Sequence, residues 1–214
     1  MNILLEIGLE EIPARFLKPS LNDIETFISK ELKENRISFG EIKTMGTPRR
    51  LVLEVSSLAD KQEDLDEINI GPSKSVAFND DGQPTKACLG FAKSQNVEVE
   101  DLEIIDNGKG EYIAVKKFLT GKNTETLLPE ILKNLILNLS FPKSMKWGTK
   151  KFRFARPLRW ILALADTKVI SFEIEGISSG NVSKGHRFFG NSEFTVDSIS
   201  DYYAKIRANF VIVN

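Results

Sequence analysis

The sequence predicts an α+β fold in which mixed, largely antiparallel sheets pack against several amphipathic helices. Short turns join three pairs of strand-like segments, and strands joined in this way pair antiparallel. Three other segments carry apolar residues at helical spacing. With 41% hydrophobic and 28% charged residues, the composition is typical of a globular protein with a packed core.

Length and composition limit the class of protein. The 214 residues fit one large domain or two small ones. No apolar run reaches the roughly 20 residues of a membrane helix, and residues 1–6 lack the pattern of a signal peptide. The single cysteine, Cys88, excludes an internal disulfide. We therefore expect a cytoplasmic protein with no membrane partner.

The first elements are a strand, a helix and a hairpin. Residues 3–7 form a short apolar run, which predicts a buried strand. Apolar side chains then recur at helical spacing and predict an amphipathic helix to about residue 36. These side chains are Leu17, Leu21, Ile24, Ile28 and Leu32. The runs at 41–45 and 51–58 flank a turn and predict an antiparallel hairpin.

The middle of the chain is acidic and contains turn signals. Residues 60–67 predict a solvated connection, and Gly71-Pro72-Ser73 would place a subdomain boundary near residue 70. A short helix is expected to end near Ser94, with Cys88 on its inner face. Residues 107–110 (NGKG) then predict the turn of a second hairpin.

The last third returns to helices and strands. Residues 124–139 have helical spacing, whereas 158–165 and 169–174 predict two strands. Ser198 and Asp201 have the spacing of a capping box, which predicts a helix from residue 198. Residues 210–214 have the composition of another strand, which indicates either a truncated chain or an edge strand.

Positive charge is concentrated in residues 141–160, which hold seven Lys and Arg and no carboxylate, although the whole chain has a net charge of −1. Both tryptophans, Trp147 and Trp160, lie there, together with Phe152 and Phe154. Cations interleaved with aromatic rings suit RNA, because the charges bind phosphates while the rings stack on unpaired bases. The pattern also fits a basic loop leading into a buried strand, with the rings in the core.

The sequence offers no self-sufficient active site. His186 is the single histidine, and no serine lies in a Gly-x-Ser-x-Gly motif. One Cys and one His cannot complete a structural zinc site, and glycine-rich nucleotide-binding loops are absent. Glu10 and Glu11 could be paired acids or magnesium ligands, or could stabilise the start of a helix. We predict no catalytic residue and no metal site in this chain.

Several motifs, taken in order, resemble those of the β subunit of bacterial heterotetrameric glycyl-tRNA synthetase. The resemblance begins at residues 5–14 (LEIGLEEIPA) and 47–51 (TPRRL), and passes through shorter matches at 71–72, 90–92 and 109–112. Its most specific blocks are 141–148 (FPKSMKWG), 154–160 (FARPLRW) and 185–188 (GHRF). Leu9 departs from the family, which usually has Thr there.

The resemblance covers residues 1–214 and implies that they are the amino-terminal region of a longer subunit. It implies that the HD-like and anticodon-binding regions lie downstream. In this family the α subunit carries the catalytic core, which activates glycine with ATP, and the β subunit binds tRNA and assembles with α into an α2β2 enzyme. The implied partners are therefore the α subunit, the tRNA for glycine and the rest of β. ATP and magnesium would serve the whole enzyme, and no cofactor is expected in this piece.

Two sets of residues are candidates for contact with tRNA. The first set comprises Lys143, Lys146, Arg153, Arg156 and Arg159, with Trp147 as a stacking platform. The second set comprises Arg49, Arg50, His186 and Arg187. They would form one surface if the segments that carry them lie side by side. In the alternative function, the same blocks dock the α subunit or the rest of β, with residues 156–160 as an internal latch. A hydrolase or editing site at His186 ranks last.

Overall fold

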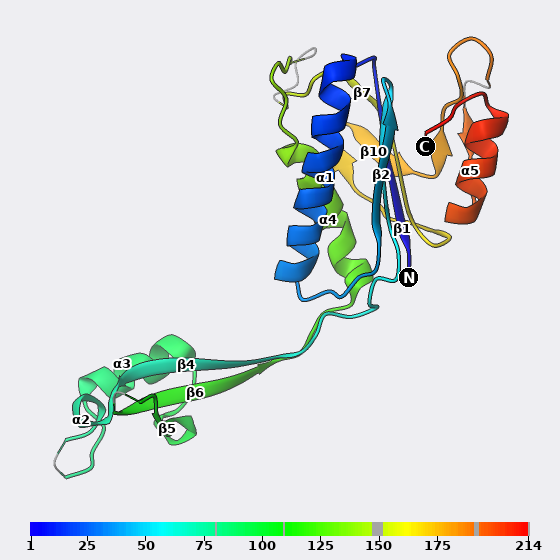
Figure 1. The fold of residues 1–214 in the computed structure, drawn as a ribbon. Helices are drawn as coiled ribbons and strands as arrows, with labels where there is room; N and C mark the ends of the chain where they lie inside the picture. Colours follow the sequence, from blue (N-terminus) through cyan, green and yellow to red (C-terminus); the bar gives the residue numbers. More distant parts are fainter. Residues whose placement is uncertain (80, 109, 147–151, 191–192, 214) are drawn as a thin grey trace. The chain divides into compact units, whose positions relative to one another are not determined.

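The computed structural model describes residues 1–214 except 80, 109, 147–151, 191–192 and 214. The chain divides into two compact units, coloured along the sequence in Figure 1. The main unit comprises Met1–Gln62 and Lys122–Asn214, and the inserted unit comprises Glu63–Gly121. Helices and mostly antiparallel sheets confirm the predicted α+β class. Gly71 and Pro72, near which the sequence suggests a boundary, lie within a strand.

The main unit is built on one sheet with strand order β2-β3-β1-β7-β10-β9, and β8 pairs with β7. Its strands are β1 (Ile3–Leu9), β2 (Ile42–Thr47), β3 (Arg50–Val55), β7 (Leu158–Ala165), β8 (Lys168–Val169), β9 (Glu173–Ile174) and β10 (Ile177–Gly180). Neighbouring strands are antiparallel except β10, which runs parallel to β7. The predicted hairpin of β2 and β3 is confirmed.

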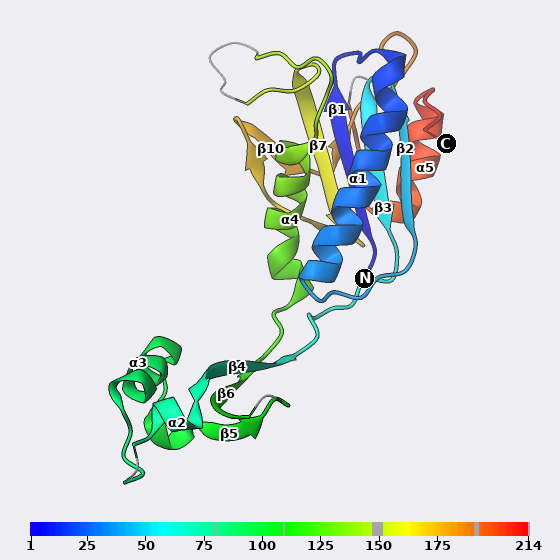
Figure 2. The same ribbon diagram turned by 60° about the vertical axis from the view of Figure 1, so that its left-hand side comes forward.

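Helices cover both faces of this sheet. Helices α1 (Ala14–Glu34) and α4 (Thr124–Asn138) lie on one face, and α5 (Ile199–Ala208) lies on the other (Figures 1 and 2). Strand β1 is therefore buried on both sides, which is why its sequence is a nearly continuous apolar run. Its Ile3, Leu5 and Ile7 join the core under α1 and α4, whereas Leu4 joins the core under α5.

The inserted unit is a small sheet with its own helices. Strand order is β4-β6-β5, all antiparallel, with bounds β4 (Leu65–Ser73), β5 (Glu103–Asp106) and β6 (Glu111–Leu119). Helices α2 (Lys74–Ala77) and α3 (Lys86–Gln95) and a 3₁₀ turn, η1 (Val99–Asp101), complete it. Cys88 packs with Ala77 and Ile113 in its core, as predicted, and burial raises the pKa of the Cys88 thiol. The acidic segment is a connection only in part, because β4 begins at Leu65.

Near the carboxyl end, the structure differs from the elements that the sequence predicts. The segment predicted as one strand at 169–174 is divided between β8 and β9, and short strands β11 (Val182–Ser183) and β12 (Phe194–Thr195) pair beyond β10. Described residues 210–213 form no strand. Their apolar character has another cause, because Val211 and Val213 are buried against α5. No helix in the described part of the chain is long and apolar enough to cross a membrane.

A close contact in the main sheet leaves no room for a side chain at Gly8. Gly8 pairs with Trp160 across β1 and β7, and a Cβ on Gly8 would lie 1.9 Å from the indole ring. We therefore expect Gly8→Ala to lower the free energy of unfolding by about 1–3 kcal/mol through overpacking. Denaturant unfolding followed by tryptophan fluorescence checks this, since both tryptophans belong to the main unit. Gly180→Ala is the control, because nothing lies within 4 Å of its added Cβ, and equal stability of the two variants would contradict the prediction.

Candidate nucleic-acid interface

A buried carboxylate on β1 organises the candidate site. Glu6 is fully buried, and Trp160 Nε1 and Ser183 Oγ donate hydrogen bonds to its Oε1 at 2.5 and 2.6 Å. The Tyr202 hydroxyl donates to Oε2, and Arg50 Nε lies 3.8 Å from the same oxygen. Burying a carboxylate is costly unless it is paired and hydrogen-bonded. Glu6 therefore joins β1 to β3, β7, β11 and α5.

Arg50 does not lie on the open surface, where the sequence places it. Its side chain is 2% exposed, its Nη2 donates to the Lys184 carbonyl at 2.7 Å, and its guanidinium lies 5.6 Å from the Trp160 ring centroid. The 3.8 Å separation from Glu6 makes an ion pair but is too long for a hydrogen bond. Nε and Nη1 of Arg50 are buried without a hydrogen-bond partner among the described residues.

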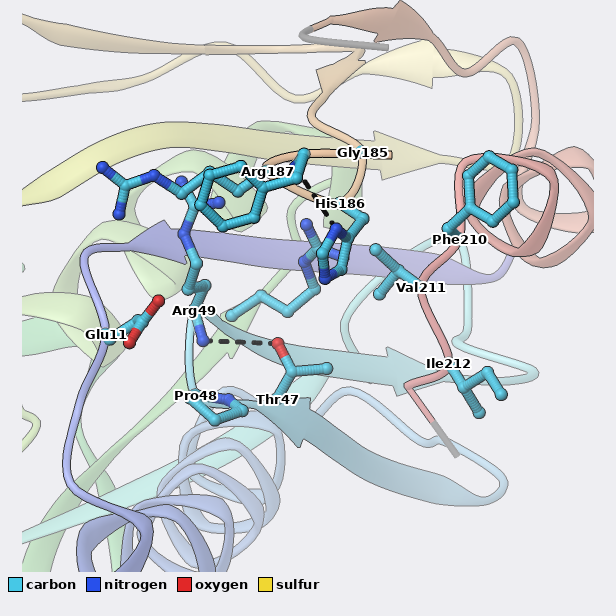
Figure 3. Close-up of a pocket in the computed structure, with 12 residues that line it drawn as sticks. Glu11, Thr47, Pro48, Arg49, Gly185, His186, Arg187, Phe210, Val211 and Ile212 are labelled. Atoms are coloured by element: carbon cyan, nitrogen blue, oxygen red, sulfur yellow. Dashed lines mark hydrogen bonds between the residues drawn. The ribbon is translucent and has the colours of Figure 1, made fainter. Parts of the chain in front are cut away.

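The second predicted set comes together in one pocket of about 370 Å³, shown in Figure 3. Its walls come from the loop after β1, the β2–β3 turn, the segment after β11 and the segment after α5. Arg49, Arg50, His186 and Arg187 all line it. Residues from distant parts of the sequence thus line one pocket together.

Backbone hydrogen bonds hold these loops together. The Leu9 amide donates to the Arg49 carbonyl and the Ile12 amide to the Pro48 carbonyl, both at 2.8 Å. On the opposite side of the pocket, the His186 amide donates to the Asn209 carbonyl at 2.9 Å. Main-chain hydrogen bonds therefore join the four wall segments of the pocket in two pairs.

The segment after β11 exposes aromatic rings beside the cations. Phe188 and Phe189 are 80% and 72% exposed, and Phe210 after α5 is 63% exposed. His186 stacks on Phe189 with ring centroids 4.8 Å apart. The Phe188 amide donates a hydrogen bond to His186 Nδ1 at 3.3 Å. The sequence analysis assigns no role to these phenylalanines, although Phe188 belongs to the GHRF motif and could have been singled out there.

The first predicted set of cations lies near this pocket, and its arginines contact neighbouring loops of the protein. Lys143 and Lys146 are exposed. Arg153 Nη2 donates to the Ser144 carbonyl at 2.9 Å, Arg156 Nε donates to the Glu11 carbonyl at 3.2 Å, and Arg159 Nε lies 3.3 Å from Glu10 Oε1. The three arginines are exposed, even though each makes a hydrogen bond or an ion pair with a neighbouring segment. Trp147 lies outside the described residues.

The aromatic residues of the basic stretch are mostly core. Phe154 is fully buried with its ring 4.5 Å from that of Phe141, and Trp160 is buried against Glu6. The buried-strand interpretation is therefore correct for these rings. The described cations of the stretch are exposed, so its positive charge and its aromatic content have separate structural causes. These cations are Lys143, Lys146, Arg153, Arg156 and Arg159.

Glu11 connects the two sets. Its carbonyl accepts the bond from Arg156, and the residue also lines the pocket that contains Arg49. The Glu10 amide donates to the Pro157 carbonyl at 3.1 Å, which joins the end of β1 to the start of β7. The described residues of both sets therefore lie at the same end of the main sheet, which we call the cationic end. Its residues are Lys143, Lys146, Arg153, Arg156, Arg159, Arg49, Arg50, His186 and Arg187. In the portions of the chain that are described, no three His, Cys, Asp or Glu side chains gather as a metal would require.

Comparison with known proteins gives one consistent result. Residues 3–214 match the family described as glycyl-tRNA synthetase beta subunit. The chain is 52% identical over 211 residues to the glycine–tRNA ligase beta subunit of Syntrophus aciditrophicus, covering 99% of the chain and 31% of that protein. Those of Geotalea daltonii and Clostridioides difficile are 50% and 45% identical, over 98% and 99% of the chain and 31% of each relative. The chain therefore spans about a third of the length of these curated relatives.

Removal of the Glu6 charge should destabilise the main unit strongly. We expect Glu6→Leu to cost about 3–5 kcal/mol, because it leaves the buried guanidinium of Arg50 uncompensated. Glu10→Gln is the matched control, since its exposed ion pair with Arg159 is worth about 0–1 kcal/mol. Chemical denaturation measures both variants. Similar losses in the two would show that the buried cluster does not hold the sheet together.

Tyr202 should make the protein sensitive to alkaline pH. Burial, and next the negative charge of Glu6, raise the pKa of Tyr202 well above its ordinary value of 10.0. Above that value the unfolded state releases a proton that the folded state keeps, so the free energy of unfolding falls as pH rises beyond about 10. Tyr202→Phe should give a shallower fall over the same range, measured by denaturant unfolding at each pH. An unchanged slope would exclude Tyr202 as the cause.

Proposed function

Because the chain belongs to the family of glycyl-tRNA synthetase beta subunits, we propose that it is part of an enzyme that joins glycine to its tRNA. In that reaction ATP, glycine and tRNA give glycyl-tRNA, AMP and diphosphate. We propose that this part of the subunit contributes no catalytic residue, and that ATP and magnesium act in the α subunit. Its own contribution is to hold tRNA at the cationic end of the main unit.

The observation that carries the tRNA proposal is the gathering of exposed cations at one end of the sheet. Lys143, Lys146, Arg153 and Arg187 are exposed there, and Arg49 lines the adjoining pocket. Phosphate contacts supply most of the affinity of proteins for nucleic acid. Exposed phenylalanines beside the cations add surfaces on which unpaired bases can stack.

The distribution of charge between the units supports the same assignment. The inserted unit contains twelve Asp and Glu and six Lys, whereas the main unit contains 18 Asp and Glu and 23 Lys and Arg. A tRNA would therefore be attracted to the main unit and repelled by the inserted unit.

Protein docking is a second candidate function, and a feature of the inserted unit favours it. Ile68 and Ile70 on β4 and Phe118 on β6 are at least half exposed, and they share a sheet face because they pair with Lys116, Ala114 and Asp66. An apolar face on an acidic unit suits a protein better than RNA. The α subunit and the remainder of the β subunit are the proposed partners.

Salt dependence tests the tRNA proposal. We expect tRNA to bind the chain with an affinity that falls steeply with salt, because each phosphate contact releases counterions. The triple variant Lys143→Gln, Lys146→Gln, Arg187→Gln should bind more weakly, with a slope of log K against log salt that is shallower by about 2, at roughly 0.7–0.9 per phosphate. Binding measured by fluorescence anisotropy at several salt concentrations gives both quantities.

The matched control removes three lysines from the inserted unit, with Lys74→Gln, Lys93→Gln and Lys116→Gln. It changes the net charge equally and should leave the slope unchanged. An equal loss in both triple variants would indicate attraction to net charge rather than to the cationic end. If the folded chain binds no tRNA, the assignment passes to protein docking.

A further inference from the structure

The pocket at the cationic end has the size of a ligand site. Its volume of about 370 Å³ lies at the lower end of the roughly 300–1,000 Å³ that is typical of small-molecule sites. Its lining includes two aromatic rings, those of Phe188 and Phe210. It also includes nitrogen-bearing side chains that can bind anions, those of Arg49, Arg50, His186 and Arg187. Figure 3 shows the Arg49 and Arg187 side chains on the same side of the pocket. A pocket of this volume suits a small ligand.

The arginines of the wall indicate the charge of the ligand. Arg50 is 98% buried and Glu6 balances its charge, and its unbonded Nε and Nη1 atoms have no exposed surface for a ligand to reach. Arg49 and Arg187 also line the pocket, and Arg187 is exposed. An anion in the pocket would pair with these two guanidinium groups, whose geometry matches the oxygens of a phosphate or carboxylate.

The aromatic rings distinguish between these anions. A peptide carboxylate would use the arginines but would have no need of the exposed faces of Phe188 and Phe210. A nucleotide uses both, because its phosphate binds cations while its base stacks on a flat ring. Glu11 also lines the pocket, and its carboxylate disfavours ligands with several adjacent phosphates.

We propose that this pocket binds one unpaired nucleotide, with its phosphate against Arg49 and Arg187 and its base against Phe188. The ligand chemistry is a single phosphate that carries a base, either free or within a single strand. The proposal deepens the proposed tRNA surface and rests on it for the strand as the source of the nucleotide. Paired regions of tRNA would then contact the surrounding cations, and an unpaired nucleotide would enter the pocket.

The test is a titration of the 214-residue chain with a single-stranded RNA tetramer, AMP, inorganic phosphate and an RNA duplex, followed by calorimetry. We expect the tetramer to bind more tightly than AMP, and AMP more tightly than inorganic phosphate. Phe188→Ala should weaken tetramer binding about tenfold, because one base–ring stack is lost, and should leave phosphate binding unchanged. Arg187→Gln should weaken the binding of the tetramer, of AMP and of inorganic phosphate.

Phe118→Ala is the matched control, since Phe118 is 64% exposed but belongs to the inserted unit. It should bind the tetramer like the unchanged chain. Binding of the tetramer no tighter than that of inorganic phosphate, or equal effects of Phe118→Ala and Phe188→Ala, would overturn the proposal.

Comparison with tRNA separates this proposal from the proposed function. If tRNA binds with the expected salt dependence while Phe188→Ala has no effect on the tetramer, the pocket proposal fails and the tRNA surface stands. If the tetramer or AMP binds in a Phe188-dependent manner while tRNA does not bind, the pocket proposal stands with a free nucleotide as its ligand, and the tRNA surface fails.

Discussion

The buried carboxylate of Glu6 is the interaction on which the main unit depends. A single acidic side chain in the central strand accepts hydrogen bonds from Trp160, Ser183 and Tyr202 and balances the charge of Arg50. Each partner belongs to a different element, so the carboxylate fixes the register of β1 against its neighbours and the position of α5. It also fixes Arg50 in the wall of the pocket, because the guanidinium is held between Glu6 and the Lys184 carbonyl. The stability of the main unit and the wall of the proposed nucleotide pocket therefore depend on one group of residues.

The two units have different physical character, which suits different partners. The main unit carries an excess of cations, gathered at the end of the sheet where β1 finishes and β7 begins. The inserted unit carries twice as many acidic as basic residues and exposes aliphatic and aromatic side chains on its sheet. In the proposed function, the main unit meets RNA and the inserted unit meets protein.

Local signals in the sequence predict much of the fold, whereas the pocket depends on contacts between distant residues. The β2–β3 hairpin, α1 and the Ser198 cap of α5 follow from turns, periodicity and capping within short segments. The limits of the inserted unit do not, because no Pro- or Gly-rich linker marks them. They are set by pairing of β4 with β6 and by the bond from the Gln62 amide to the Lys122 carbonyl. The sequence leaves two interpretations of the aromatic rings in the basic stretch open, an RNA surface and a buried core. The choice of the core for Trp160 and Phe154 requires knowledge of Glu6 and Phe141 as their partners. The burial of Arg50 is not predicted from the sequence either, because it also depends on contact with the distant residue Glu6.

Hydrogen–deuterium exchange in the presence and absence of tRNA tests the central claim most directly, because it locates the contact without altering the protein. If the cationic end of the main sheet holds tRNA, amides in residues 9–13, 47–50, 143–146 and 185–188 should exchange more slowly in the complex. These segments are far apart in sequence and meet only in the folded main unit. Slower exchange confined to residues 63–121 would contradict the account and would assign RNA binding to the inserted unit.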